Sequence, residues 1–208
     1  GFDEESFVRA RPDAAEAGQP FTLVHSGVIY PSERDPSALF GALGYLLRSG
    51  RIGPHSFRLV LRATGHDGHL AALVERAGIG SVVTLAPHIP YSAALSEMLS
   101  ADGLLVLQAA NCNAQVPAKL YEYFRARRPI LALTDATGNT AAAMRAAGID
   151  TIAPLDDPGE IAATLERFIA AAAAGTAPLA STPVIEACSR RARSRELARL
   201  LDRVTATA

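Results

Sequence analysis

The sequence has few cysteines, no excess of charge of either sign, and no long apolar run. Only Cys112 and Cys188 occur among 208 residues, which excludes a disulfide-stapled scaffold and suits a reducing compartment. The 20 Lys and Arg residues nearly balance the 21 Asp and Glu residues, so no overall positive field would attract nucleic acid. No apolar run reaches the roughly 18 residues that span a bilayer, and no signal peptide opens the chain. We therefore expect a cytoplasmic protein.

Three common catalytic and nucleotide-binding motifs are also missing. Without G-x-x-x-x-G-K-[ST] a P-loop phosphotransferase is disfavoured, and without G-x-S-x-G so is an α/β-hydrolase. The one G-x-G, residues 78–80, precedes an apolar run instead of opening a helix. That context favours a helix C-cap and a turn over a dinucleotide fingerprint.

Two weaker features carry no assignment. His66, Asp67 and His69 lie in the loop TGHDGH, but two histidines without further ligands do not make a zinc site. Asp67 is equally suited to cap the helix that follows. Cys112 has no obvious base beside it and is more typical of a bystander than of a nucleophile. We assign no metal and no cofactor.

Apolar runs and amphipathic stretches alternate from residue 21 onward, in a chain that is 49% apolar and 20% charged. The apolar runs, typical of strands buried on both faces, are residues 21–25, 57–61, 82–85, 104–108, 130–133 and 151–153. The expected helices are residues 36–48, 68–77, 91–100, 117–127, 139–147 and 158–174. This order predicts a Rossmann-like, doubly wound α/β fold: a parallel sheet of about six strands with helices on both faces.

The two ends differ from this central region, residues 21–175. Residues 1–20 are acidic, then rich in Ala, Gly and Pro, and lack periodicity, so we expect a linker within a longer protein. Residues 176–208 predict a loop and an amphipathic helix, with Arg190, Arg191, Arg193, Arg195, Arg199 and Arg203 opposite an apolar stripe of Leu197, Leu200, Leu201 and Val204. That helix either docks on the domain with a solvated arginine face, meets a partner domain, or contacts anionic lipid.

The loop after the first expected strand has the composition of a phosphate site. Gly27 removes a side chain where the backbone turns, and Arg34 offers a bidentate fork for phosphate oxygens. A turn glycine and a surface arginine would give the same pattern. After the third strand, two prolines flank His88 and Ile89, and this rigid backbone suits the edge of a nucleobase.

The segment from residue 111 to 133 is the most specific. Pro117 suits the first turn of a helix, which places the amides of Gln115 and Val116 near its positive end, ready for a diphosphate. Lys119 and Glu122 share one face of that helix, the lysine for an anion and the glutamate for ribose hydroxyls. An ordinary ion pair between these two side chains is the alternative.

The loop at residues 134–140 has two readings. Gly138 and its polar neighbours could close over a ligand, or Asn139 or Thr140 could cap a helix. We assign it no role.

The order of HSGVIY, PHIPYSAAL and VPAKLYEYFRARRPILAL resembles the C-terminal, donor-binding half of GT-B glycosyltransferases of the family 4, or group 1, type. The resemblance covers about residues 1–170. It implies a nucleotide-sugar donor, an N-terminal acceptor-binding domain outside this chain, and metal-independent transfer with retention. By position it implies Gly27, Arg34, Gln115 and Val116 at the diphosphate, the backbone at 88–89 at the base, and Glu122 at the ribose.

One position departs from that family. Many members carry a second glutamate eight residues before the ribose-binding one, and this chain has Ala114 there. A side-chain amide from Asn111 or Asn113 is the candidate replacement. The departure favours one alternative, a non-catalytic nucleotide-binding module. A nonhydrolysing sugar-nucleotide epimerase half, an enzyme class that shares this scaffold, is the other alternative.

Overall fold

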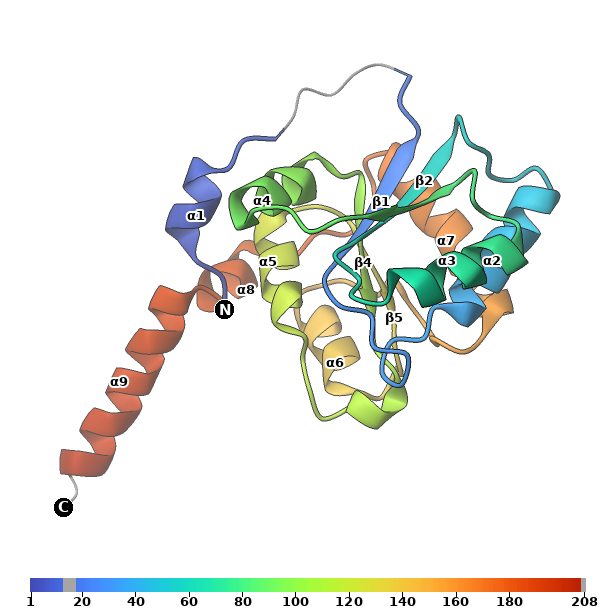
Figure 1. Ribbon diagram of the computed structural model, residues 1–208. Coiled ribbons are helices and arrows are strands. Elements are labelled where there is room, and N and C mark those ends of the chain that lie inside the picture. The colour runs from blue at the N-terminus through green and yellow to red at the C-terminus, as the bar shows by residue number, and fades with distance from the viewer. Residues whose placement is uncertain (13–17, 207–208) are drawn as a thin grey trace.

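The structure is a computed structural model that describes residues 1–12 and 18–206. At its centre lies a six-stranded, all-parallel sheet with the order β3-β2-β1-β4-β5-β6 (Figure 1). The strands are β1 (Phe21–Ser26), β2 (Phe57–Arg62), β3 (Val83–Ala86), β4 (Gly103–Leu107), β5 (Ile130–Leu133) and β6 (Ile152–Ala153). The order reverses between β1 and β4, which makes this a doubly wound sheet.

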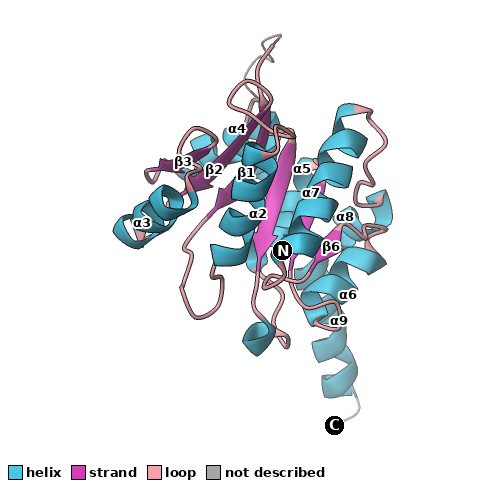
Figure 2. Cartoon of the chain, turned by 90° about the vertical axis from the view of Figure 1, so that its right-hand side faces the viewer, coloured by secondary structure: helices cyan, strands magenta, loops and turns pink. Residues whose placement is uncertain are grey.

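Helices cover both faces of the sheet (Figure 2). One face carries α2 (Ser37–Arg48), α3 (Asp67–Ala77) and α7 (Pro158–Ala173). The other carries α4 (Tyr91–Ser100), α5 (Ala118–Ala126) and α6 (Asn139–Ala146), with α1 (Glu4–Arg9) and α8 (Thr182–Ala187) at its edge. A short 3-10 turn, η1 (Ala110–Cys112), follows β4, and α9 (Arg190–Ala206) ends the described chain.

Alternation along the buried strands creates two cores. Leu105 and Leu107 of β4 point into the layer of α2, α3 and α7, whereas Leu104 and Val106 point into the layer of α4, α5 and α6. All four side chains are at most 1% exposed. Both faces of each central strand must therefore be apolar, which is why these strands read as continuous hydrophobic runs.

The expected fold is confirmed. Each of the six strands and six helices expected between residues 21 and 174 begins and ends within one residue of its place in the structure. The turn expected at residues 78–80 is also present, because Gly78 is the left-handed C-cap of α3 with φ +68°.

The expectation of no regular structure before residue 21 is wrong for residues 4–9, which form α1. Phe2 and Phe7 are buried with their rings edge to face at 5.8 Å, and Phe2 pairs with Ser189 through a parallel bridge. These apolar contacts hold the first ten residues on the domain, a role that their composition does not reveal. Residues 13–17 of the expected linker lie outside the described chain.

The single helix expected near the C-terminus is also wrong, and so is the alternative in which that helix docks on the domain. Two helices, α8 and α9, occupy this region, and α9 buries none of its residues. It extends away from the body of the domain (Figure 1), and its apolar stripe stays exposed, from 47% at Leu200 to 63% at Val204. Because the described chain does not cover this stripe, the two remaining readings are a partner domain and lipid.

None of the described helices combines the length and the apolar character that crossing a bilayer requires.

Candidate nucleotide-binding site

The candidate site lies where the connections from two neighbouring strands diverge. The loop after β1 leads to α2 on one face of the sheet, and the loop after β4 leads to α5 on the other. In open α/β sheets this divergence leaves a crevice at the carboxyl ends of the strands, where ligands bind. Gly27 directly follows β1, and Lys119 lies in the first turn of α5.

The structure brings Gly27 and Lys119 together. A Cβ atom added to Gly27 would lie 3.1 Å from the Lys119 Nζ, so the glycine leaves room for the lysine ammonium. The backbone at Gly27 has φ +119°, a conformation that glycine adopts without strain. Lys119 Nζ also lies 3.1 Å from Nε2 of His25, the fully buried next-to-last residue of β1.

Arg34 adds a second positive charge to this site. Its side chain is 20% exposed, donates from Nη1 to the Val28 carbonyl at 3.1 Å, and lies 5.5 Å from the centroid of the Tyr30 ring. Burial and then the charge of Arg34 lower the pKa of Lys119 to about 7, while Glu122 acts in the opposite direction. An arginine and a lysine thus share this partly buried space, and both side chains can donate hydrogen bonds to an anion.

Glu122 lies one turn further along α5 and accepts a hydrogen bond from the Tyr91 hydroxyl at 2.8 Å. Burial and then this carboxylate raise the pKa of Tyr91 well above its ordinary value, so the hydroxyl stays a donor. Lys119 and Glu122 do not form an ion pair within 4 Å in the described chain. The alternative of an ordinary ion pair on a helix surface is therefore wrong.

The two backbone amides expected at the diphosphate have different surroundings. The Gln115 amide donates to the Cys112 carbonyl at 2.9 Å and is occupied within the loop. The Val116 amide has no backbone partner among the described residues. Pro117 is the N-cap of α5, one residue earlier than its expected place in the first turn. The amide donors at this site are thus Val116 and the first turn of α5.

Asn111 and Asn113, the candidate replacements for the absent glutamate, both bond to the protein. The Asn111 amide donates to the Ser32 carbonyl at 2.9 Å, and the Asn113 amide donates to Asp135 at 2.7 Å. Asn113 Oδ1 is buried without a hydrogen-bond partner in the described chain. The two side chains join the loop after β4 to the loops after β1 and β5.

Gln108, at the end of β4, holds the same loop from inside. It is 3% exposed, donates from Nε2 to the carbonyls of Cys112 at 2.7 Å and Gln115 at 3.1 Å, and accepts from the Thr140 hydroxyl. Thr140 is therefore a buried contact in α6. The N-cap of that helix is Gly138, so the expectation of a cap at Asn139 or Thr140 is wrong.

The expected base-binding loop follows β3. His88 is exposed and Ile89 is half-buried, so their backbone borders solvent. Arg62 anchors this loop by donating to the Pro87 carbonyl at 2.7 Å and to both oxygens of Glu97 at 2.5 and 2.6 Å. This anchor joins β2 and α4 across an interval of 35 residues, which sequence spacing could not show.

His66, Asp67 and Cys112 do not act together. Asp67 accepts from the Thr64 hydroxyl, and the N-cap of α3 is His66, so the expectation that Asp67 caps this helix is wrong. Cys112 is buried in η1 with its thiol free. In residues 1–12 and 18–206, no three His, Cys, Asp or Glu side chains gather closely enough to hold a metal ion.

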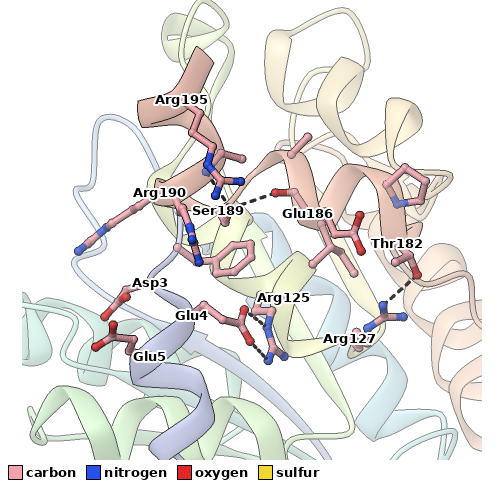
Figure 3. Close-up of a pocket in the computed structure, with 16 residues that line it drawn as sticks. Asp3, Glu4, Glu5, Arg125, Arg127, Thr182, Glu186, Ser189, Arg190 and Arg195 are labelled. Carbon is pink, nitrogen blue, oxygen red and sulfur yellow. Dashed lines mark hydrogen bonds and ion pairs between the residues drawn. The ribbon is translucent and has the colours of Figure 1, made fainter. Parts of the chain in front are cut away.

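A large cavity of about 960 Å³ lies elsewhere, among α1, the C-terminal end of α5, α8 and α9 (Figure 3). Figure 3 shows Arg125 paired with Glu4 and Arg127 bonded to Thr182, which joins the two terminal segments to the domain. Lys119 lies in the first turn of α5 and Arg125 in its last turn, so this cavity lies at the opposite end of the helix from the candidate site.

No protein-family model matches this sequence, and no curated protein matches it. Solved structures do. Sucrose-phosphate synthase from Thermosynechococcus elongatus is similar over 100% of this chain and 52% of its own, with TM-score 0.72 and 15% identity. The α,α-trehalose 6-phosphate synthase from Burkholderia multivorans is similar over 98% and 45%, with TM-score 0.64 and 14% identity.

A third similar structure is WaaG, a glycosyltransferase involved in lipopolysaccharide biosynthesis, over 86% of this chain and 43% of its own, with TM-score 0.56 and 21% identity. The chain thus spans about half the length of these three enzymes. Its fold is that of a GT-B glycosyltransferase domain of the C-terminal type.

Proposed function

We propose that this chain is the donor-binding domain of a nucleotide-sugar-dependent glycosyltransferase. The observation that carries this proposal is the convergence of Arg34, Lys119 and the start of α5 beside Gly27 at the divergence of β1 and β4. Two cations and a helix N-terminus form a site of the right chemistry for a diphosphate. The fold it shares with the three enzymes supports the assignment.

The chemistry of this site is electrostatic. Breaking the bond between a sugar and a diphosphate leaves negative charge on the leaving group. Arg34 and Lys119 stabilise that charge without a metal ion, and Glu122 accepts hydrogen bonds from the ribose. We propose that the sugar is a hexose, transferred with retention of configuration. An N-terminal domain outside this chain would hold a glycan, lipid or small-molecule acceptor, in the cytoplasm or at the inner face of the membrane.

Thermal shift with UDP, GDP and ADP tests the site. We expect one preferred nucleotide, and we expect Arg34→Ala to weaken it about tenfold or more by removing charge-assisted hydrogen bonds to phosphate. Arg58→Ala is the matched control, because Arg58 is exposed on β2 and belongs to no part of the site. If Arg34→Ala and Arg58→Ala bind the preferred nucleotide equally well, the assignment of Arg34 to the diphosphate is wrong. The purified 208-residue chain should bind nucleotide but transfer no sugar.

A non-catalytic binding module remains a second candidate, because Ala114 and the occupied amides of Asn111 and Asn113 leave the donor sugar without its expected carboxylate. Transfer activity of the two-domain protein distinguishes the candidates. The epimerase alternative gains no support: His25 is fully buried, with both ring nitrogens engaged by the Leu105 carbonyl and Lys119.

A further inference from the structure

Lys119 is the only lysine among the 20 Lys and Arg residues of this chain. Its ammonium has no carboxylate within ion-pair distance in the described chain, and its hydrogen-bond partner is the Nε2 atom of His25 at 3.1 Å. A protein that otherwise uses arginine for every cationic side chain thus places its one titratable ammonium in the candidate diphosphate site.

The second contact of His25 fixes its protonation. Nδ1 lies 2.9 Å from the Leu105 carbonyl, which only accepts, so Nδ1 carries the proton and Nε2 presents a lone pair to Lys119. The ring is 0% exposed. Burial first, and then the charges of Lys119 and Arg34, hold the pKa of His25 well below its ordinary value. His25 is therefore a neutral acceptor aimed at the lysine.

Gly27 completes the arrangement. The Nζ atom of Lys119 lies within 3.1 Å, and Cε within 3.6 Å, of the place where a Cβ at position 27 would be. The lysine side chain therefore lies over the backbone that turns out of β1.

The charged groups that face this ammonium oppose each other. Arg34, from the loop after β1, repels it, and Glu122, on α5 itself, attracts it. Glu122 is already bonded to Tyr91, and the hydroxyl of Tyr123, also from α5, accepts from the Ser26 amide at 3.3 Å. Burial and the charge of Arg34 together outweigh the attraction of Glu122, so they disfavour the charged form of the lysine until an anion enters.

We propose that His25 is a positioning residue that holds Lys119 over Gly27, and that Lys119 takes up a proton from solvent when a diphosphate binds. The neutral amine becomes an ammonium that keeps one hydrogen bond to Nε2 of His25 and directs the others to phosphate oxygens. This inference rests on the proposed function, because it deepens the same diphosphate site. It predicts that diphosphate binding is coupled to pH.

The first test needs no ligand. Lysine labelled with ¹³C and ¹⁵N gives a single side-chain signal in this chain, so its titration by NMR belongs to Lys119 without further assignment. We expect the midpoint at about pH 7, well below the ordinary value of 10.5. A midpoint near the ordinary value would overturn the proton-uptake part of the proposal.

The second test is calorimetry with inorganic pyrophosphate at pH 8, in two buffers of different ionisation enthalpy. The wild-type chain should take up more protons per bound pyrophosphate than Lys119→Arg, which stays charged, so the subtraction removes the protons of pyrophosphate itself. Equal proton uptake by both proteins would overturn the inference while leaving the diphosphate site in place. If neither pyrophosphate nor a nucleoside diphosphate binds, the proposed function fails and this inference fails with it.

The third test concerns His25. His25→Phe removes the acceptor, so we expect about tenfold weaker pyrophosphate binding and a lower Lys119 midpoint. His25→Gln places an amide oxygen near the position of Nε2 and should recover binding to within about threefold. A Lys119 midpoint unchanged in both variants, measured on folded protein by the rest of its NMR spectrum, would reduce His25 to a structural role.

Discussion

Glu122 shares its carboxylate between the protein and the proposed ligand, because Tyr91 already donates to Oε1. A carboxylate has lone pairs enough to accept from ribose as well. We expect Glu122→Ala to weaken the binding of ribonucleoside diphosphates about tenfold or more. It should also abolish any preference of the protein for ribonucleoside diphosphates over their 2′-deoxy analogues. Calorimetry with UDP and dUDP, or with whichever base proves preferred, measures both quantities.

Tyr91→Phe is the control for that substitution. It removes the hydroxyl and keeps the carboxylate, so the preference for ribose should remain. A ribose preference that survives Glu122→Ala would place the ribose elsewhere in the crevice.

Gly27 carries both backbone strain and a close contact. We expect Gly27→Ala to lower the free energy of unfolding by about 1–3 kcal/mol, because alanine strains at φ +119° and its Cβ would crowd Lys119. Gly50→Ala is the matched control, since Gly50 also has positive φ, +71°, but no atom lies within 4 Å of its added Cβ. Denaturant unfolding should show the larger loss at Gly27. An equal loss of unfolding free energy at both positions would mean that the Lys119 side chain moves aside for the new Cβ atom with no loss of stability.

Part of this site is visible in the sequence. Gly27 and Arg34 stand out because they lie in the loop after a buried strand, at the edge where parallel strands end, and Lys119 stands out because it lies near the start of an expected helix. The contact between Lys119 and His25 joins residues 94 positions apart, and His25 reads as one polar residue in an apolar run. The way α5 packs beside β1 decides this contact, and local sequence patterns carry no information about that packing.

At the scale of elements, the loop after β3 depends on the ion pair between Arg62 and Glu97. Both side chains are less than a quarter exposed, and the guanidinium also binds the Pro87 carbonyl. We expect Arg62→Leu to lower the free energy of unfolding by about 1–3 kcal/mol and to weaken nucleotide binding, because the loop loses its anchor. Pyrophosphate binding should stay unchanged, since pyrophosphate has no base to place in that loop.

Calorimetry of Arg62→Leu with a nucleotide and with pyrophosphate distinguishes an effect on the loop after β3 from an effect on the diphosphate site. A parallel loss for nucleotide and pyrophosphate would mean that the loop after β3 does not hold the base. Arg76→Leu serves as the control substitution, because Arg76 is exposed in the last turn of α3.

Elements between residues 21 and 174 could be predicted within one residue because the strands are short apolar runs, buried throughout in β4 and β5, and the helices between them bury one face, which leaves a clear periodic pattern. The ends could not. Phe2 packs against Phe7 and pairs through its backbone with Cys188 and Ser189, and this pairing joins opposite ends of the chain. Nothing within the first ten residues distinguishes a docked segment from a linker.

At the scale of the whole molecule, the apolar stripe of α9 has no cover in the described chain. We expect Leu197→Glu with Leu201→Glu to change the free energy of unfolding by no more than about 0.5 kcal/mol, because both side chains are more than half exposed. Leu165→Ala in α7, which is 0% exposed, should cost about 2–5 kcal/mol and serves as the control. Denaturant unfolding measures both, and a comparable loss from the α9 pair would mean that the helix docks on the domain in solution.

The proposed function includes a second domain outside this chain, and that domain is the partner we propose for this stripe; the chain spans about half the length of the three enzymes whose fold it shares. If the proposed function holds, the same pair of substitutions should lower sugar transfer by the proposed two-domain protein about tenfold, since two glutamates in an apolar contact disfavour it. Nucleotide binding by the 208-residue chain should stay unchanged, because α9 lies beyond the opposite end of α5 from Lys119. Binding of the wild-type chain to vesicles containing phosphatidylglycerol, lost in the substituted chain, would instead assign the stripe and its arginines to a membrane surface.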